Sequence, residues 1–190
     1  MKTIHIFLIF VIVVLVQLFV PAKMIFDRED ILKTGTVYKF KTRPVDPSDP
    51  FRGKYITLNY EMDSAESKDI TWQRGEKILV YIESDSLGYA KVYDVSKDQL
   101  GTDKDYIEAK VIWNNGKSNT VNFELPFDRF YMEESKAKPA EDIYREYNTQ
   151  RNANNDTYAL VAIKNGEAVL KNVYINDNPI RYYIENHNNQ

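Results

Sequence analysis

The sequence contains no cysteine, which excludes a disulfide framework, a thiolate nucleophile and cysteine-ligated metal centres. Its two histidines, His5 and His187, stand near opposite ends of the chain, so we expect neither histidine-based catalysis nor a metal site. An excess of basic residues is also missing, because 25 Lys and Arg face 28 Asp and Glu. General nucleic-acid binders are basic, so we expect no nucleic-acid partner. Nothing in this composition calls for a cofactor.

A long apolar run opens the chain. Residues 4–20 read IHIFLIFVIVVLVQLFV, and a helix of this length reaches about 25 Å, close to the ~30 Å hydrocarbon core of a bilayer. We interpret residues 1–22 as a transmembrane anchor that meets the lipid bilayer through residues 4–20. The alternative is a cleaved signal peptide, with Lys2 as its charged start and Val20-Pro21-Ala22 as its cleavage site.

The remaining residues divide into a juxtamembrane segment (23–34), one β domain (35–186) and a flexible tail (187–190). More Lys and Arg follow the apolar run than precede it, which does not favour export of the domain. A very short N-terminal tail before a long apolar run is nevertheless typical of exported chains. We therefore expect a single-pass membrane protein whose domain lies on the extracytoplasmic side.

The domain is predicted to be mainly β, an antiparallel sheet or barrel-like fold with one short helix. The clearest strand signal is the alternation of Ile56, Leu58 and Tyr60 with polar neighbours, which indicates one buried face. Asn165-Gly166 separates two apolar runs and predicts a two-residue type I′ hairpin. The predicted helix covers residues 138–147, with Pro139 in its first turn. The predicted strands cover residues 37–41, 55–61, 77–82, 89–95, 106–113, 120–125, 158–164, 168–175 and 180–184.

The most distinctive segment is PVDPSDPFRGKYITLNY, residues 44–60. Its second half, from Gly53 to Tyr60, resembles the signature of the GDYXXLXY proteins, and the preceding PVDP and Phe51-Arg52 resemble the way that family enters its signature. Lys54 stands where the family has its name-giving Asp, so no ligand or ion role of that acid is carried over. The resemblance extends to residues 129–134 and 166–180.

The resemblance implies an envelope protein with an N-terminal membrane segment and no established activity. Genes of this family often accompany one for a polytopic membrane protein, which suggests a membrane-protein partner. Slight similarity to type I signal peptidases, which use a Ser nucleophile and a Lys base, raises a cell-envelope hydrolase as an alternative. The nucleophile's place is Val45 here, however, so we expect no enzyme activity.

Several residues are candidates for binding, each with a plainer structural interpretation. Asp46 and Asp49 have the oxygen ligands that a hard cation prefers, but Asx-turn hydrogen bonds are the more ordinary role between prolines. Arg52 suits a partner carboxylate or phosphate, or an internal pair with either aspartate. Surface tyrosines suit a protein or glycan, or else the core and rim of the sheet. The candidate binding set is Asp46, Asp49, Arg52, Gly53, Tyr55, Tyr60, Arg129 and Tyr131.

The leading hypothesis is a non-catalytic binding or assembly partner of another membrane protein. The alternatives are the envelope hydrolase and a secreted ligand-binding protein released by cleavage after Ala22.

Overall fold

The computed structural model describes residues 3–43, 55–115, 119–147 and 156–187. Twelve strands and three helices lie within these ranges, and the strands form a mainly β, nearly closed, barrel-like fold. The predicted fold class is thereby confirmed. Asp46, Asp49, Arg52 and Gly53, together with Lys54, lie outside the described residues.

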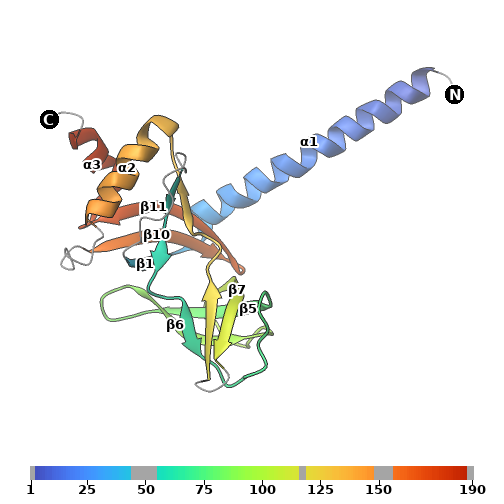
Figure 1. Cartoon of the computed structure of the whole chain (residues 1–190). Helices are drawn as coiled ribbons and strands as arrows, with labels where there is room; N and C mark the ends of the chain where they lie inside the picture. Colours follow the sequence, from blue (N-terminus) through green and yellow to red (C-terminus); the bar gives the residue numbers. More distant parts are fainter. Residues whose placement is uncertain (1–2, 44–54, 116–118, 148–155, 188–190) are drawn as a thin grey trace.

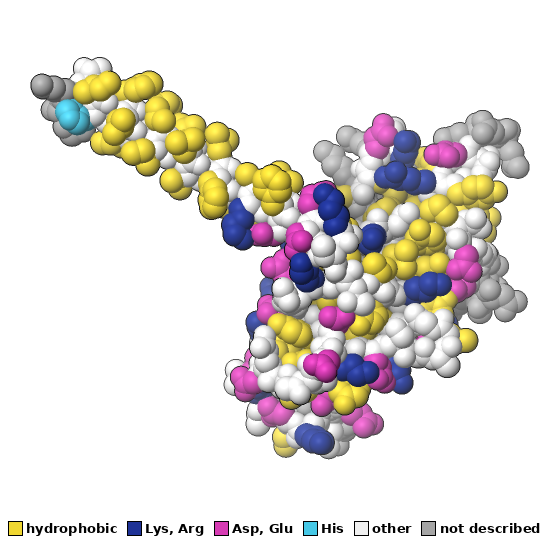
Figure 2. All heavy atoms as spheres, turned by 180° about the vertical axis from the view of Figure 1, so that it is seen from behind, with side chains coloured by type: hydrophobic (Ala, Val, Ile, Leu, Met, Phe, Trp, Pro, Cys, Tyr) yellow, Lys and Arg dark blue, Asp and Glu magenta, His cyan; other side chains and the backbone are white. Residues whose placement is uncertain are grey.

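Helix α1 (Thr3–Thr34) projects from the domain as a long rod (Figure 1). Apolar side chains cover the face of this rod that Figure 2 shows, and its most apolar 18-residue window is entirely unburied. The helix is long and apolar enough to cross a membrane. It runs without a break through Pro21 and through the segment that we assigned as juxtamembrane, residues 23–34.

The end of α1 is fixed to the domain. Ile31 is the one buried residue of this helix, and its last turns contact strands β10 (Thr157–Lys164) and β11 (Glu167–Ile175). The Lys164 ammonium lies 2.6 Å from the Asp30 carboxylate. Only Gly35 separates α1 from β1 (Thr36–Arg43), so helix and sheet are joined without a linker.

The sheet that contacts α1 is called the proximal sheet. Its order is β12-β11-β10-β1-β3, and all its pairings are antiparallel. β10 pairs with β11 through Lys164 and Glu167, and the intervening Asn165 and Gly166 have φ of 52° and 85°, which confirms the predicted hairpin. The two short strands are β3 (Asn59–Tyr60) and β12 (Asn178–Pro179).

The second five-stranded sheet, called the distal sheet, has the order β4-β8-β7-β5-β6. Isolated bridges between Lys39 and Tyr89 and between Ile107 and Gly166 connect the two sheets. Both sheets share one core, in which the rings of Phe40, Tyr60 and Phe127 meet edge to face at 5.1 to 5.9 Å. The distal strands are β4 (Ser64–Glu66), β5 (Lys77–Ser84), β6 (Ala90–Ser96), β7 (Tyr106–Asn115) and β8 (Thr120–Glu124).

The predicted strand over residues 55–61 is in fact two short strands. Ile56, Leu58 and Tyr60 are buried as the alternation indicates. However, β2 (Tyr55–Thr57) pairs with β9 (Arg129–Tyr131), whereas β3 pairs with β1. The chain therefore changes partner at Leu58, which periodicity along one strand does not reveal.

The predicted strand over residues 180–184 is wrong, because this segment is helix α3 (Ile180–His187). Asn176 and Asp177 adopt positive φ and turn the chain, so pairing with β11 ends at Pro179. Ile180 and Ile184 are then buried one helical turn apart. Five residues are too few to distinguish a helical from a strand period.

Helix α2 (Glu134–Tyr147) packs against α3 and contacts β2. It begins before the predicted residue 138, so Pro139 lies inside the helix rather than at its start. Ala140, Ile143 and Tyr144 form its buried face. Figure 1 shows α2 and α3 together on the same side of the proximal sheet.

Candidate functional site

Three of the predicted binding residues lie together on the β2–β9 pair. Tyr55 and Tyr131 are directly opposite in the register, and their ring centroids are 5.3 Å apart. The guanidinium carbon of Arg129 lies 5.0 Å from the centroid of the Tyr55 ring, in a cation–π arrangement. We call these three residues the tyrosine–arginine patch. It is open to solvent, because Tyr131 is 63% exposed.

Local contacts hold Arg129 in its charged form. A hydrogen bond with Tyr131 raises the pKa of the Arg129 guanidinium, and the neighbouring Tyr55 and Asp128 act in the same direction. The Asp128 carboxylate is 3.7 Å from Nε of Arg129, so the pair is loose and solvated. The patch therefore combines a permanent cation with two aromatic faces.

Tyr60 lies apart from this patch, in the core. Its side chain is buried, and its hydroxyl donates a hydrogen bond of 2.8 Å to the Phe127 carbonyl. Burial also raises the pKa of the Tyr60 phenol. These contacts make Tyr60 a residue that supports the fold rather than part of the exposed patch.

A groove of about 610 Å³ begins beside the patch. Four cations line it, and each comes from a different element: Arg28 from α1, Arg129 from β9, Lys171 from β11 and Arg181 from α3. Buried side chains, including Phe127 and Phe130, form its apolar lining. We call it the basic groove. No sequence signal could have identified it, because these residues are distant along the chain.

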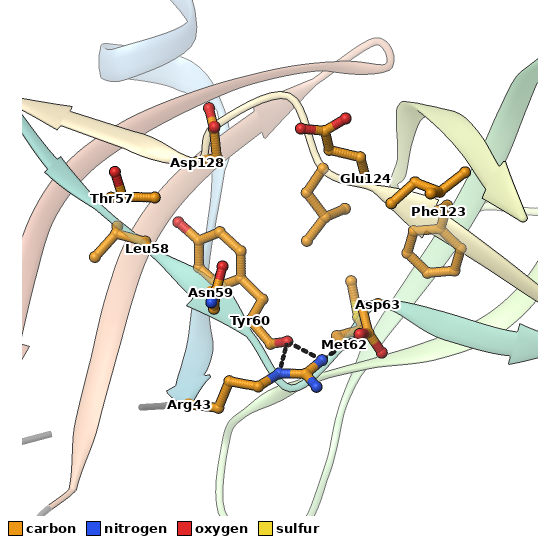
Figure 3. A pocket seen from close by; sticks show the side chains of 12 residues that line it. Arg43, Thr57, Leu58, Asn59, Tyr60, Met62, Asp63, Phe123, Glu124 and Asp128 are labelled. Carbon is orange, nitrogen blue, oxygen red and sulfur yellow. Dashed lines mark hydrogen bonds and ion pairs between the residues drawn. The ribbon is translucent and has the colours of Figure 1, made fainter. Parts of the chain in front are cut away.

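A second hollow, of about 400 Å³, is lined in part by residues 57–60 (Figure 3). Arg43 donates two hydrogen bonds to the Tyr60 carbonyl, at 2.8 and 2.7 Å, and pairs with Asp63. Glu124 and Asp128 line the same hollow. We call it the acidic cavity. Of its three carboxylates, Asp63 is held by Arg43 and Asp128 is the loose partner of Arg129.

The lining residues of the two hollows offer charged groups of both signs and hydrogen-bonding groups. The lining of the acidic cavity, as far as the structure describes it, contains no Ser, Lys or His. The sequence has one Ser-x-x-Lys spacing, at Ser135 and Lys138, but it lies on the exposed side of α2, where Lys138 pairs with Asp142 at 2.8 Å. Among the described residues, no group of three or more His, Asp or Glu side chains is arranged to hold a metal ion.

Comparison with curated proteins found no match, and comparison with solved structures found none either. The GDYXXLXY protein family model, in contrast, matches residues 17–173. The match begins within the apolar part of α1 and ends in β11, so it includes the tyrosine–arginine patch, the acidic cavity and most of the basic groove. This range is most of the chain, and the protein therefore belongs to the GDYXXLXY family.

Proposed function

We propose that this protein is a single-pass, membrane-anchored binding module whose β domain lies on the extracytoplasmic side and docks another membrane protein through the tyrosine–arginine patch. The observation that carries the proposal is the exposed, preorganised cluster of Tyr55, Arg129 and Tyr131 beside the end of α1.

The continuity of α1 supports an uncleaved anchor. A secretory signal is removed at a small-residue site after its apolar run. Here the candidate site, Val20-Pro21-Ala22, lies inside a helix that continues to Thr34. That helix is fixed to the domain through Ile31 and Asp30, so its two halves form one rod.

The composition of the patch supports protein recognition. Tyrosine and arginine are enriched at the energetic centres of protein interfaces, because they bury a large area at a small cost in side-chain entropy. Tyr55 and Arg129 already hold one another in place, which reduces the ordering required on binding. Arg129 and Tyr131 also line the groove that reaches Arg28 on α1. A partner in the same membrane would therefore present its extramembrane residues close to this patch.

The proposal is tested by site-specific photocross-linking of the full-length protein in intact cells. The photoreactive residue is placed at position 131, and position 93 serves as the matched control, because Tyr93 is similarly exposed (51%) but lies on the distal sheet. We expect one abundant membrane protein to be captured from position 131 and not from position 93.

The variant Arg129→Ala should then reduce capture from position 131 about tenfold or more, as expected for loss of a central arginine. Its melting temperature should stay close to that of the wild type, since Arg129 is solvated. Equal capture from positions 93 and 131, or no protein captured from position 131, would contradict the proposal.

A further inference from the structure

The basic groove has a charge that its own lining does not balance. Its described lining includes four cations and no Asp or Glu. Acids occur at its edge: Asp128 forms a loose pair with Arg129 at 3.7 Å, and Glu133 lines a smaller hollow together with Arg181 and Lys136. Asp27 and Glu167 adjoin the groove residues Arg28 and Ala168 in the chain, and Asp27 is paired with Lys23. The groove therefore concentrates positive charge around an apolar lining.

The hydrogen bonds of these cations leave their charges available. Arg28 donates to the Ala168 carbonyl at 3.2 Å, and Lys171 reaches the Leu32 carbonyl at 3.4 Å. Both acceptors are neutral, so these bonds position the side chains without compensating their charge. Within the part of the chain that the structure describes, Arg181 makes no ion pair.

The groove lies at a particular depth relative to the apolar part of α1. Phe26 is the last exposed large apolar residue of this helix, and Arg28 follows about 3 Å further along its axis. The stretch from Ile4 to Phe26 is about 35 Å long, slightly more than the ~30 Å hydrocarbon core. With this stretch in the bilayer, Arg28 reaches the layer of lipid headgroups. Lys23, five residues and about 7.5 Å earlier, extends its side chain in the same direction along the helix, toward Asp27, with which it pairs at 2.5 Å.

From this position and charge we infer that the basic groove binds the phosphate of an anionic phospholipid from the adjacent leaflet. Guanidinium groups match phosphate oxygens in a bidentate geometry, and Arg28, Arg129 and Arg181 approach the groove from three elements. The apolar lining from Phe127 and Phe130 suits the glycerol and first methylenes of a lipid. An acidic peptide would satisfy the charge, but the depth of Arg28 favours the lipid.

This inference depends on the anchor in the proposed function and not on the protein partner. The full-length protein is inserted into nanodiscs containing equal amounts of phosphatidylglycerol and phosphatidylcholine. Native mass spectrometry then identifies the lipids that stay bound after the disc is removed. Separate flotation with phosphatidylcholine vesicles tests the anchor alone. Failure to float refutes the anchor, whereas flotation without lipid selectivity refutes only the groove.

The test variant is Lys171→Gln with Arg181→Gln, and the matched control is Arg74→Gln with Lys110→Gln. The control residues are exposed and lie at or near the distal sheet, and their substitution removes the same amount of positive charge. We expect the wild type and the control to retain phosphatidylglycerol over phosphatidylcholine. Because each basic residue contributes about 1 kcal/mol near an anionic surface, the test variant should lose roughly tenfold or more of that preference.

Three results would overturn the inference. They are no preference in the wild type, an equal preference in both double variants, and displacement of the lipid by excess soluble glycerol phosphate, which would identify the ligand as a free phosphate. Circular dichroism and thermal melting confirm that each variant is folded. If the double variant does not fold, Arg181→Gln alone replaces it, because Arg181 is exposed on α3.

Discussion

A central strand of the proximal sheet and an edge strand of the distal sheet differ in burial. Strand β10, in the middle of the proximal sheet, is buried at six of its eight positions, because the core covers one face and the end of α1 reaches the same sheet. Strand β6, at the edge of the distal sheet, is buried only at Val95. Strand β5, in the interior of the distal sheet, is buried at five of its eight positions, so a strand's burial follows its place within the sheet more than its distance from α1.

The cations of the distal sheet and those of the basic groove have different kinds of partner. On the distal sheet, Lys77 pairs with Glu108 at 2.6 Å, and Lys91 and Lys104 pair with Glu83 at 2.9 and 3.1 Å. In the basic groove, Arg28 and Lys171 bind backbone carbonyls instead. Lysines that face acids form an ordinary solvated surface, whereas cations that face neutral groups have no compensating charge beside them, as the inferred lipid site requires.

The largest predicted effect tests whether the two sheets unfold together as one cooperative unit. Phe40→Ala in the proximal sheet and Phe123→Ala in the distal sheet should each lower the free energy of unfolding by about 3–5 kcal/mol, because both rings are 1% exposed in one core. Thermal unfolding followed by circular dichroism should show one transition in each variant. Leu87→Ala, at a 77% exposed position, is the control. Two separate transitions would show that the sheets unfold independently.

A smaller effect is predicted at the junction of α1 with the proximal sheet. A Cβ atom on Gly35 would lie 2.6 Å from the Ile31 carbonyl oxygen and 2.9 Å from that of Ile163, both of which are backbone atoms. Gly35→Ala should therefore lower the free energy of unfolding by about 1–3 kcal/mol. Gly101→Ala is the matched distal substitution, since a Cβ there has no atom within 4 Å and should change stability little. Equal melting temperatures for the two variants would contradict the close packing of this junction.

The smallest predicted effect is a pH dependence on the distal side. Hydrogen bonds from the Thr71 hydroxyl and backbone N–H, with an ion pair from Lys97, lower the pKa of Asp69 from 3.8 to about 2. A carboxyl group whose pKa is lower in the folded than in the unfolded protein stabilises the fold at a pH above its unfolded-state pKa. This stabilisation is lost as the pH falls through its folded-state pKa. Asp69→Asn should thus melt below the wild type at neutral pH, with the difference disappearing near pH 2.

The control for this pH series is Asp98→Asn, whose side chain makes no ion pair within the described residues. It should follow the wild type across the whole range. A wild-type advantage over Asp69→Asn that persists unchanged near pH 2 would show that the carboxylate is not the source of the stability.

Local patterns in the sequence predicted the local elements well. The apolar run became α1, and Asn165-Gly166 formed the hairpin because both residues tolerate positive φ. Burial of Ile56, Leu58 and Tyr60 also followed their alternation. These features depend on neighbours in the chain, which are visible in one sequence.

Features that depend on distant residues were not predictable in this way. The tyrosine–arginine patch requires β2 to pair with β9, and the basic groove requires α1, β9, β11 and α3 to meet. The candidate residues Tyr55, Arg129 and Tyr131 came from a family resemblance and a general preference, which did not state that they would touch. No local rule separates them from Tyr60, whose hydroxyl turns inward to Phe127.

The direct passage from Thr34 through Gly35 into β1 has a mechanical consequence. A transmembrane helix longer than the local bilayer tilts, and it becomes more upright as the bilayer thickens. Because no flexible linker separates α1 from the proximal sheet, the domain must turn through the same angle as the helix. The apolar stretch of about 35 Å slightly exceeds an average core of ~30 Å, so some tilt is expected. In the proposed membrane-anchored form, a difference in membrane thickness would thus change the orientation of the proposed binding surfaces.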